Sequence, residues 1–162
     1  VYQPMLELLD YLRDNGFKVF IVTGGGVDFV RGISEPVYGV PKDQVVGSSL
    51  VYAWDPATES VRRTPELGSV DDKAGKPPNI ALHIGRRPAI CVGNSDGDLQ
   101  MLQYTDAGPG PSLKVLVHHD DPEREYDYHH GTVEALKQTQ ERNWTFVSIQ
   151  KDFKVVFPPK AD

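Results

Sequence analysis

Apolar residues along the chain recur with two different periods, and segments of the two kinds alternate. Spacings of three and four residues place apolar side chains on one helix face and predict helices over 4–14, 27–37, 77–84, 96–104 and 133–142. Short apolar runs rich in β-branched residues predict strands over 17–22, 45–53, 60–63, 89–92, 114–117, 145–149 and 154–157. Pro4 suits a first helical turn, and Asn15-Gly16 is a helix stop.

The alternation of helices and strands predicts an α/β fold. The connections are a few residues long, which is typical of βα units in a mainly parallel sheet with helices on both faces. Three strands, 17–22, 89–92 and 114–117, are nearly continuous apolar runs, as expected for parallel strands covered on both sides. We therefore expect a single α/β domain over residues 1–162, with a small β-hairpin around Pro56.

Composition and charge exclude several classes of protein. Of the 162 residues, 39% are hydrophobic and 25% are charged, as in a globular protein with a substantial core. The formal charge of −6 argues against a general nucleic-acid binder. No apolar run approaches the ~20 residues of a membrane-spanning helix. We expect a soluble protein of the cytoplasm or periplasm, whose single cysteine, Cys91, is a buried thiol in a strand.

Thr23 directly follows the predicted strand 17–22 and precedes three glycines. A hydroxyl followed by the N–H groups of Gly24 and Gly25, ahead of a helix, is suited to bind phosphate oxygens. Ligands of parallel sheets bind at this end of the strands. The alternative is a turn that needs glycine for its backbone, with Thr23 capping the next helix.

A lysine before the predicted helix 77–84 is a candidate to neutralise a bound phosphate. Lys73 stands in a polar stretch from which its side chain could reach the strand ends as a point charge. Lys76 is the competing candidate in the same segment. The alternative for either residue is a solvated surface lysine.

The segment GNSDGD, residues 93–98, carries more side-chain oxygen than a strand-to-helix turn needs. Asn94, Asp96 and Asp98 are the hard oxygen donors that Mg²⁺ prefers. The alternative is helix capping, in which one of these side chains or Ser95 accepts from the first N–H groups of the helix. Because a cap needs only one acceptor, the surplus favours a magnesium site.

The five histidines do not show the pattern of a metal site. His118-His119 and His129-His130 are adjacent pairs, and neighbours on a strand point to opposite faces. No two histidines have the i, i+4 spacing of helical zinc ligands. We therefore expect all five, including His83, to lie on the surface or in loops.

Taken in order, FIVTGG, Lys73 and ICVGNSDGDLQML resemble the motifs of the haloacid dehalogenase (HAD) superfamily, most closely its phosphoserine-phosphatase-like branch. These proteins are mostly Mg²⁺-dependent phosphatases with a Rossmann-like, three-layer core. The resemblance covers nearly the whole chain. It assigns Thr23 to the family's second motif, Lys73 to the third, and Gly93, Asn94 and Asp98 to the fourth, usually written GDxxxD.

The resemblance also implies a mechanism. The family's first motif, DxDx[TV], supplies an aspartate that attacks phosphorus to form an aspartyl-phosphate, and a second aspartate for proton transfer. The motif does not occur in this sequence, so we expect it upstream, with most of the cap, and expect the chain alone to be inactive. Thr23, Gly24 and Gly25 would hold phosphoryl oxygens and Lys73 would neutralise charge. Asp98 would orient the metal waters or Lys73.

One departure concerns the metal, because Asn94 stands where the family usually has aspartate. An amide oxygen contributes no charge, so the affinity for Mg²⁺ should be lower unless Asp96 or Asp98 compensates.

The expected function of the complete protein is hydrolysis of a small phosphorylated metabolite, without nucleic-acid or membrane partners. An upstream segment or a second chain would complete the core. Two alternatives are a non-catalytic α/β binding module and another HAD activity, either a phosphomutase or a dehalogenase. Since dehalogenases need no Mg²⁺, the oxygen-rich turn weighs against them.

Overall fold

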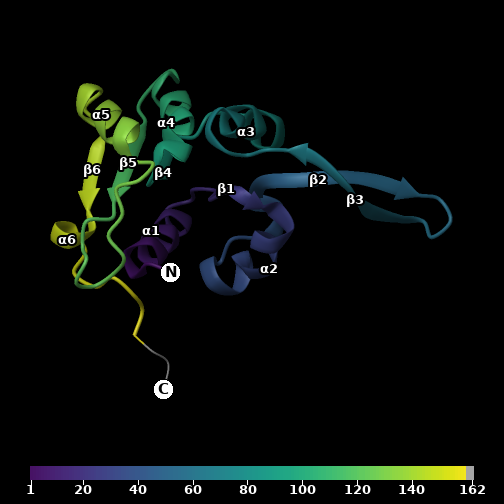
Figure 1. Cartoon of the computed structure of the whole chain (residues 1–162), viewed down its shortest axis with the longest axis horizontal. Coiled ribbons are helices and arrows are strands. Elements are labelled where there is room, and N and C mark those ends of the chain that lie inside the picture. The colour runs from purple at the N-terminus through teal and green to yellow at the C-terminus, as the bar shows by residue number, and fades with distance from the viewer. Residues whose placement is uncertain (160–162) are drawn as a thin grey trace. The chain divides into compact units, whose positions relative to one another are not determined.

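The computed structural model describes residues 1–159, which divide into two compact units. The terminal unit combines residues 1–19 with the chain from Arg86 onward, and the middle unit is Phe20–Gly85. Each contains a three-stranded sheet with helices (Figure 1). The α/β fold is therefore confirmed, whereas the single domain over residues 1–162 stays a prediction.

The middle unit is built on the sheet β1–β2–β3. Its elements are β1 (Ile21–Gly26), α2 (Val27–Tyr38), η1 (Lys42–Gln44), β2 (Val45–Asp55), β3 (Ser60–Ser69), η2 (Lys73–Gly75) and α3 (Lys76–Ile84). Strand β1 pairs in parallel with the first part of β2, and the rest of β2 forms an antiparallel hairpin with β3. Buried apolar side chains form its core: Val27, Val40, Val45, Val46 and Ile80.

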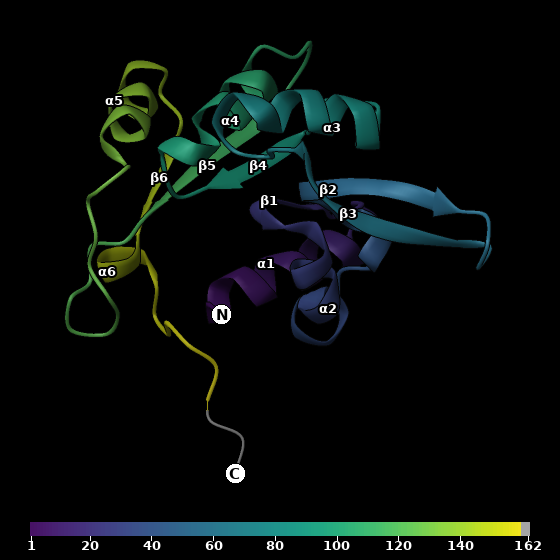
Figure 2. The same ribbon diagram turned by 45° about the vertical axis from the view of Figure 1, so that its right-hand side comes forward.

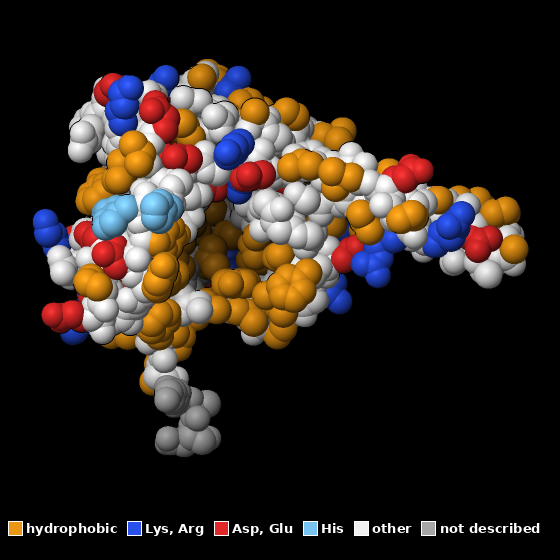
Figure 3. All heavy atoms as spheres, in the orientation of Figure 1, with side chains coloured by type: hydrophobic (Ala, Val, Ile, Leu, Met, Phe, Trp, Pro, Cys, Tyr) orange, Lys and Arg blue, Asp and Glu red, His pale blue; other side chains and the backbone are white. Residues whose placement is uncertain are grey.

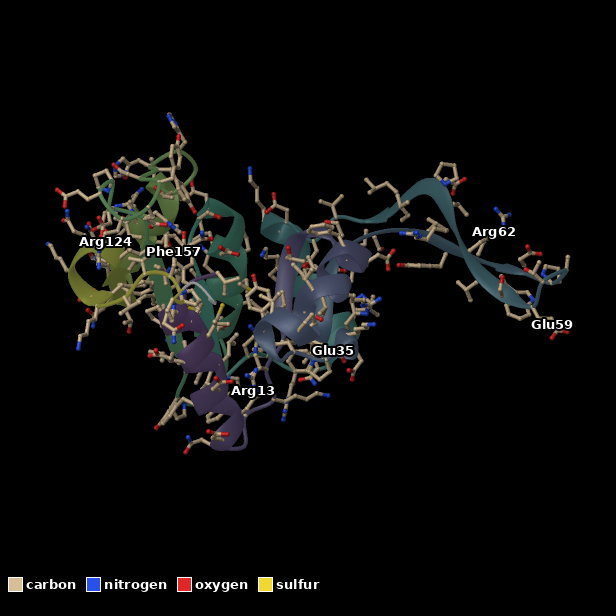
Figure 4. All side chains as sticks on the ribbon, turned by 90° about the horizontal axis from the view of Figure 1, so that it is seen from below. Arg13, Glu35, Glu59, Arg62, Arg124 and Phe157 are labelled. Atoms are coloured by element: carbon tan, nitrogen blue, oxygen red, sulfur yellow. The ribbon has the colours of Figure 1, made fainter. Side chains whose placement is uncertain are left out.

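The hairpin of β2 and β3 is longer than the predicted one. Its strands extend to Asp55 and Ser69, because pairing with β2 continues through a polar stretch of β3 that has no strand-like periodicity. Glu59, at the turn, has a φ of 48° (Figure 4). Apolar side chains stay exposed along the hairpin (Figure 3): Leu50, Tyr52, Trp54, Val61 and Leu67.

The terminal unit is built on the fully parallel sheet β4–β5–β6. Its elements are α1 (Gln3–Asp14), β4 (Ile90–Gly93), η3 (Asp96–Asp98), α4 (Leu99–Asp106), β5 (Leu113–His118), α5 (Val133–Glu141), β6 (Thr145–Ser148) and α6 (Ile149–Asp152). Helix α4 connects β4 to β5 and lies against both strands (Figure 2). Cys91 is buried in β4, as predicted. No helix among residues 1–159 is long and apolar enough to cross a bilayer.

The first strand lies later in the sequence than predicted. The strand expected over 17–22 is β1, which begins at Ile21, where pairing with Val45 starts. The predicted glycine loop belongs to this strand, since Gly26 still pairs with Ser48 after an irregularity in the register. These bounds depend on which residues of β1 pair with β2. The spacing of apolar residues along the chain carries no information about that pairing.

The strand predicted over 154–157 is wrong. Residues 149–152 form the short helix α6, and the chain beyond it pairs with no strand among the described residues. Phe153 and Val156 instead pack with Val117 and Ile149 in the core of the terminal unit. Within the predicted strand, Val156 is therefore buried in a core without pairing in a sheet, whereas Val155 and Phe157 are exposed.

Arg124 fastens the loop after β5 to α6 (Figure 4). Its guanidinium donates to the carboxylate of Asp121. It also donates to three main-chain carbonyls, those of Phe153 at 2.7 Å, Ile149 at 2.8 Å and Gln150 at 3.2 Å. Asp121 is only 2% exposed, so this contact compensates a buried negative charge.

Replacing Arg124 by leucine is expected to lower the free energy of unfolding of the complete protein by about 3 kcal/mol, since a buried carboxylate loses its partner. Arg124→Lys should recover only part of this loss, because an ammonium cannot match the planar donor array. Urea denaturation followed by circular dichroism measures both effects. Arg62→Leu, at an exposed hairpin position, is the matched control, expected within about 0.5 kcal/mol of the unsubstituted protein. An equal loss in both leucine variants would contradict the role of Arg124.

Candidate functional site

In the middle unit, Thr23 lies on β1 directly before the exposed glycines. Its Oγ1 accepts a hydrogen bond from the N–H of Gly25 at 3.1 Å. A hydroxyl that accepts through a lone pair keeps its own hydrogen as a donor. Thr23 is therefore able to donate to an oxygen of a bound anion.

Gly47, on the neighbouring strand β2, makes this arrangement possible. A Cβ at position 47 would lie 2.9 Å from Thr23 Cγ2 and 3.0 Å from the carbonyl oxygen of Gly25. Both distances are shorter than ordinary carbon contacts allow, so any side chain there would displace the Thr23 segment. The hydroxyl of Ser48, next in β2, donates to the carbonyl of Gly24 at 2.9 Å and holds the same segment from the other end.

The two candidate lysines have different environments. Lys76, the first residue of α3, is 5% exposed, and its Nζ donates to the carbonyl of Val22 at 2.9 Å. Val22 directly precedes Thr23 within β1, so the ammonium is held against the main chain next to Thr23. Lys73 is exposed on the turn η2, with a φ of 49°. The geometry within the middle unit thus favours Lys76 over the Lys73 of the sequence analysis.

A buried carboxylate that the sequence analysis missed, Asp71, belongs to the same group of residues. It is fully buried, its Oδ1 accepts from Asn79 Nδ2 at 3.0 Å, and its N–H donates to Ser48 Oγ at 2.9 Å. Burial raises the pKa of Asp71, while the hydrogen bond from Asn79 and the positive charge of Lys76 act against that rise. No sequence signal distinguished Asp71 within its polar stretch.

In the terminal unit, the turn after β4 is organised by Asp98. This residue is 8% exposed, and its Oδ2 accepts from the N–H of Asn94 at 2.9 Å and of Ser95 at 3.3 Å. Ser95 Oγ in turn accepts from the N–H of Gly97 at 3.3 Å, which completes a capping box. The capping alternative is therefore realised, and it brings Asn94 and Asp98 together.

Gly93 is required by the close approach of Asp98. A Cβ at position 93 would lie 2.5 Å from Asp98 Cβ and 2.9 Å from its Cγ, which no packing adjustment of a buried side chain accommodates. Gly93 thus leaves room for the side chain of Asp98.

Asp96, the third predicted metal ligand, is directed elsewhere. Its Oδ1 accepts from the N–H of Ala135 at 2.7 Å, and its own N–H donates to the carbonyl of Gly131 at 2.6 Å. It therefore caps the first turn of α5, where a negative charge is stabilising. Oδ1 of Asp96 is therefore directed to α5 rather than to Asn94 and Asp98.

The histidines are predicted on the surface or in loops; His119 does lie in the loop after β5, but it is buried there, with 4% exposed. Its Nε2 lies 3.0 Å from Asn94 Nδ2, and its ring stacks on Tyr128 with centroids 4.4 Å apart. His83, His129 and His130 are exposed, as predicted. A usable signal existed, since His119 follows β5 as Asn94 follows β4, and ligand sites gather at this edge of a parallel sheet.

The donor set of the terminal unit fits Mg²⁺ in chemistry. Among residues 1–159, no three His, Cys, Asp or Glu side chains lie close enough together to hold a metal ion. Asn94 and Asp98 offer an amide oxygen and a carboxylate, which are hard donors. Mg²⁺ in proteins is commonly held by one or two carboxylates together with waters and substrate phosphate, so a sparse set of protein donors is consistent with it.

Comparison with known proteins supports the fold. No protein-family model and no curated protein matches the chain. It is similar to the crystal structure of a phosphoserine phosphohydrolase-like protein from Francisella tularensis subsp. tularensis SCHU S4, with a TM-score of 0.50 and 15% sequence identity. The match covers 85% of this chain and 62% of that one, so the chain spans less than two thirds of its neighbour. The likeness confirms the α/β fold.

Proposed function

We propose that the chain provides the accessory half of a Mg²⁺-dependent phosphomonoester hydrolase of the HAD type, which acts in the complete protein on a small phosphorylated metabolite. The central observation is the buried ammonium of Lys76, 2.9 Å from the carbonyl that directly precedes Thr23. A buried cation next to a strand residue that carries a hydroxyl, ahead of a run of glycines, suits a phosphate. The fold likeness to a phosphoserine phosphohydrolase-like protein supports the same class.

In this proposal the middle unit binds the phosphoryl group. The Thr23 hydroxyl, already oriented by the N–H of Gly25, donates to one phosphoryl oxygen, and the Gly24 segment lies alongside it. Lys76 takes the role that sequence analysis gives to Lys73, and neutralises negative charge that develops during transfer. Its burial strengthens this effect, because a charge acts over a longer range where water is excluded.

The terminal unit would hold the metal through Asn94 Oδ1 and the carboxylate of Asp98. When bound, Mg²⁺ would offset negative charge that develops during the reaction. Asn94 supplies no charge, so Asp98 provides the negative charge of this donor pair. The chain lacks a DxDx[TV] segment, and we therefore assign the nucleophilic aspartate and the acid–base aspartate to a segment outside these 162 residues.

The complete protein is expected to hydrolyse p-nitrophenyl phosphate in the presence of Mg²⁺, to stop in excess EDTA, and to recover when Mg²⁺ is restored, since the charge screening depends on the ion. The release of p-nitrophenol measures each step. Hydrolysis that persists in EDTA would exclude the metal dependence. Failure with Mg²⁺ across a panel of phosphomonoesters would instead favour the non-catalytic binding module.

A further inference from the structure

A hydrogen-bonded cluster of polar side chains lies behind Asn94 in the terminal unit. Its members are Tyr2, Asn94, His119, Glu125 and Tyr128. The side chains of His119 and Glu125 are 4% and 3% exposed, respectively. Buried polar groups are retained where their hydrogen bonds are satisfied, and a satisfied network orients its members.

The amide nitrogen of Asn94 faces two acceptors in this cluster. Its Nδ2 lies 2.6 Å from Tyr128 Oη and 3.0 Å from His119 Nε2. An amide NH₂ has two hydrogens, so both are committed to these contacts. His119 Nε2 can accept one of them only if it carries no proton itself.

The other side of the imidazole selects that tautomer. His119 Nδ1 lies 3.0 Å from Glu125 Oε1, and a carboxylate accepts but does not donate. Tyr2 Oη also lies 3.1 Å from Nδ1, but its hydrogen is directed to Glu125, so the proton of the neutral ring belongs on Nδ1. Tyr2 donates its phenolic hydrogen to Glu125 Oε2, which occupies the second carboxylate oxygen. Asn94 thus donates to His119, and His119 donates to Glu125. Tyr2 donates to the other carboxylate oxygen of Glu125.

We propose that His119 is a positioning residue that holds the Asn94 amide with its nitrogen toward the cluster and its oxygen as the atom offered to a cation. An asparagine amide rotated by half a turn would present an NH₂ group, which repels cations. Hydrogen-bonded partners behind a metal ligand fix the ligand's orientation and affinity in this way. The part of the inference that concerns Mg²⁺ rests on the function proposed above.

The tautomer is tested directly by nitrogen NMR of the unliganded, uniformly ¹⁵N-labelled complete protein at neutral pH. The expected result for His119 is a protonated Nδ1 and a bare Nε2, with Asn94 NH₂ resonances protected from exchange. The reverse tautomer, or a doubly protonated ring, would place a donor opposite Asn94 and overturn the proposal. This measurement requires neither a variant nor a metal.

The consequence for the cation is tested by titrating Mn²⁺, a paramagnetic substitute for Mg²⁺, and following free Mn²⁺ by electron paramagnetic resonance. His119→Leu should weaken binding by roughly 10-fold or more, the usual effect of removing a hydrogen-bonded partner of a ligand. His119→Gln can still accept from Asn94 through its amide oxygen, so it should stay within about 3-fold of the unsubstituted protein. Unchanged binding in His119→Leu would overturn the positioning role.

His118→Leu is the matched control, since the adjacent ring lies against His129 and Phe146, 5.3 and 5.7 Å away between centroids, and should leave Mn²⁺ binding unchanged. Equal losses in His118→Leu and His119→Leu would indicate general damage to the loop and count against the proposal. If the unsubstituted protein binds no Mn²⁺ or Mg²⁺, the proposed metal dependence fails and with it the cation role. The NMR result then still decides whether His119 orients Asn94.

Discussion

Replacing Lys76 by methionine should lower the rate of phosphomonoester hydrolysis by the complete protein roughly 1,000-fold, the effect of removing one preorganised group that stabilises developing negative charge. Methionine keeps an unbranched apolar stem in the buried site and removes only the ammonium that donates to the Val22 carbonyl. Thermal denaturation checks that the fold persists, since the fully buried Asp71 also loses a nearby positive charge. The measurement is kcat and KM for p-nitrophenyl phosphate at saturating Mg²⁺.

Lys73→Met is the matched control for this experiment. Lys73 stands three residues earlier on the exposed turn η2, and its loss should change the rate by less than about 3-fold, as expected for a group away from the reacting atoms. The two variants separate the two candidate lysines. A large loss in Lys73→Met with little change in Lys76→Met would reverse the assignment and restore the lysine that the sequence pattern favours.

Changing Asp98 to asparagine should lower the rate about 100-fold and raise the Mg²⁺ concentration needed for half-maximal activity, as loss of a charged ligand does. Asparagine retains an oxygen that can accept from the N–H groups of Asn94 and Ser95, so the capping geometry is largely preserved. The charge is what the substitution removes. Activity measured as a function of Mg²⁺ concentration separates a weaker metal site from a slower chemical step.

Asp96→Asn is the control, because the Asp96 carboxylate caps α5 through the N–H of Ala135. Removing its charge should cost about 0.5–1 kcal/mol of folding free energy and leave the activity within about 3-fold of the unsubstituted protein. Equal losses of activity in Asp96→Asn and Asp98→Asn would show that Asp96 is a ligand after all, as the surplus of oxygen in GNSDGD suggests. A full rate in Asp98→Asn would remove Asp98 from the site.

The elements that the sequence predicted well are those whose periodicity is local. Helix α2 was expected over 27–37 and spans Val27–Tyr38, and β5 was expected over 114–117 and spans Leu113–His118. Their apolar spacing follows directly from which face is buried. The errors fall where pairing or packing between distant residues decides the outcome. The glycines of β1 are in a strand because they pair with β2, and Val156 is buried because it packs against Val117 and Ile149.

The candidate site shows the same division. The sequence pattern predicted Thr23, Asn94 and Asp98 as site residues after strands, because the strand–turn–helix order is written in consecutive residues, but Thr23 lies within β1. It could not separate Lys76 from Lys73, since both precede the predicted helix 77–84 and they stand only three positions apart. Lys76 begins α3 and is buried, whereas Lys73 lies on the turn η2 and is exposed.

The sequence by itself determined the α/β class, the parallel strands and the oxygen-rich turn after β4, because each depends on neighbours along the chain. Only the tertiary structure decided which lysine is buried, that Asp96 belongs to α5, and that His119 and Glu125 stand behind Asn94. The contact of Asn94 with His119 joins residues 25 positions apart. Burial and hydrogen-bond partners at such separations follow from how strands and helices pack, and no local pattern of residues encodes them.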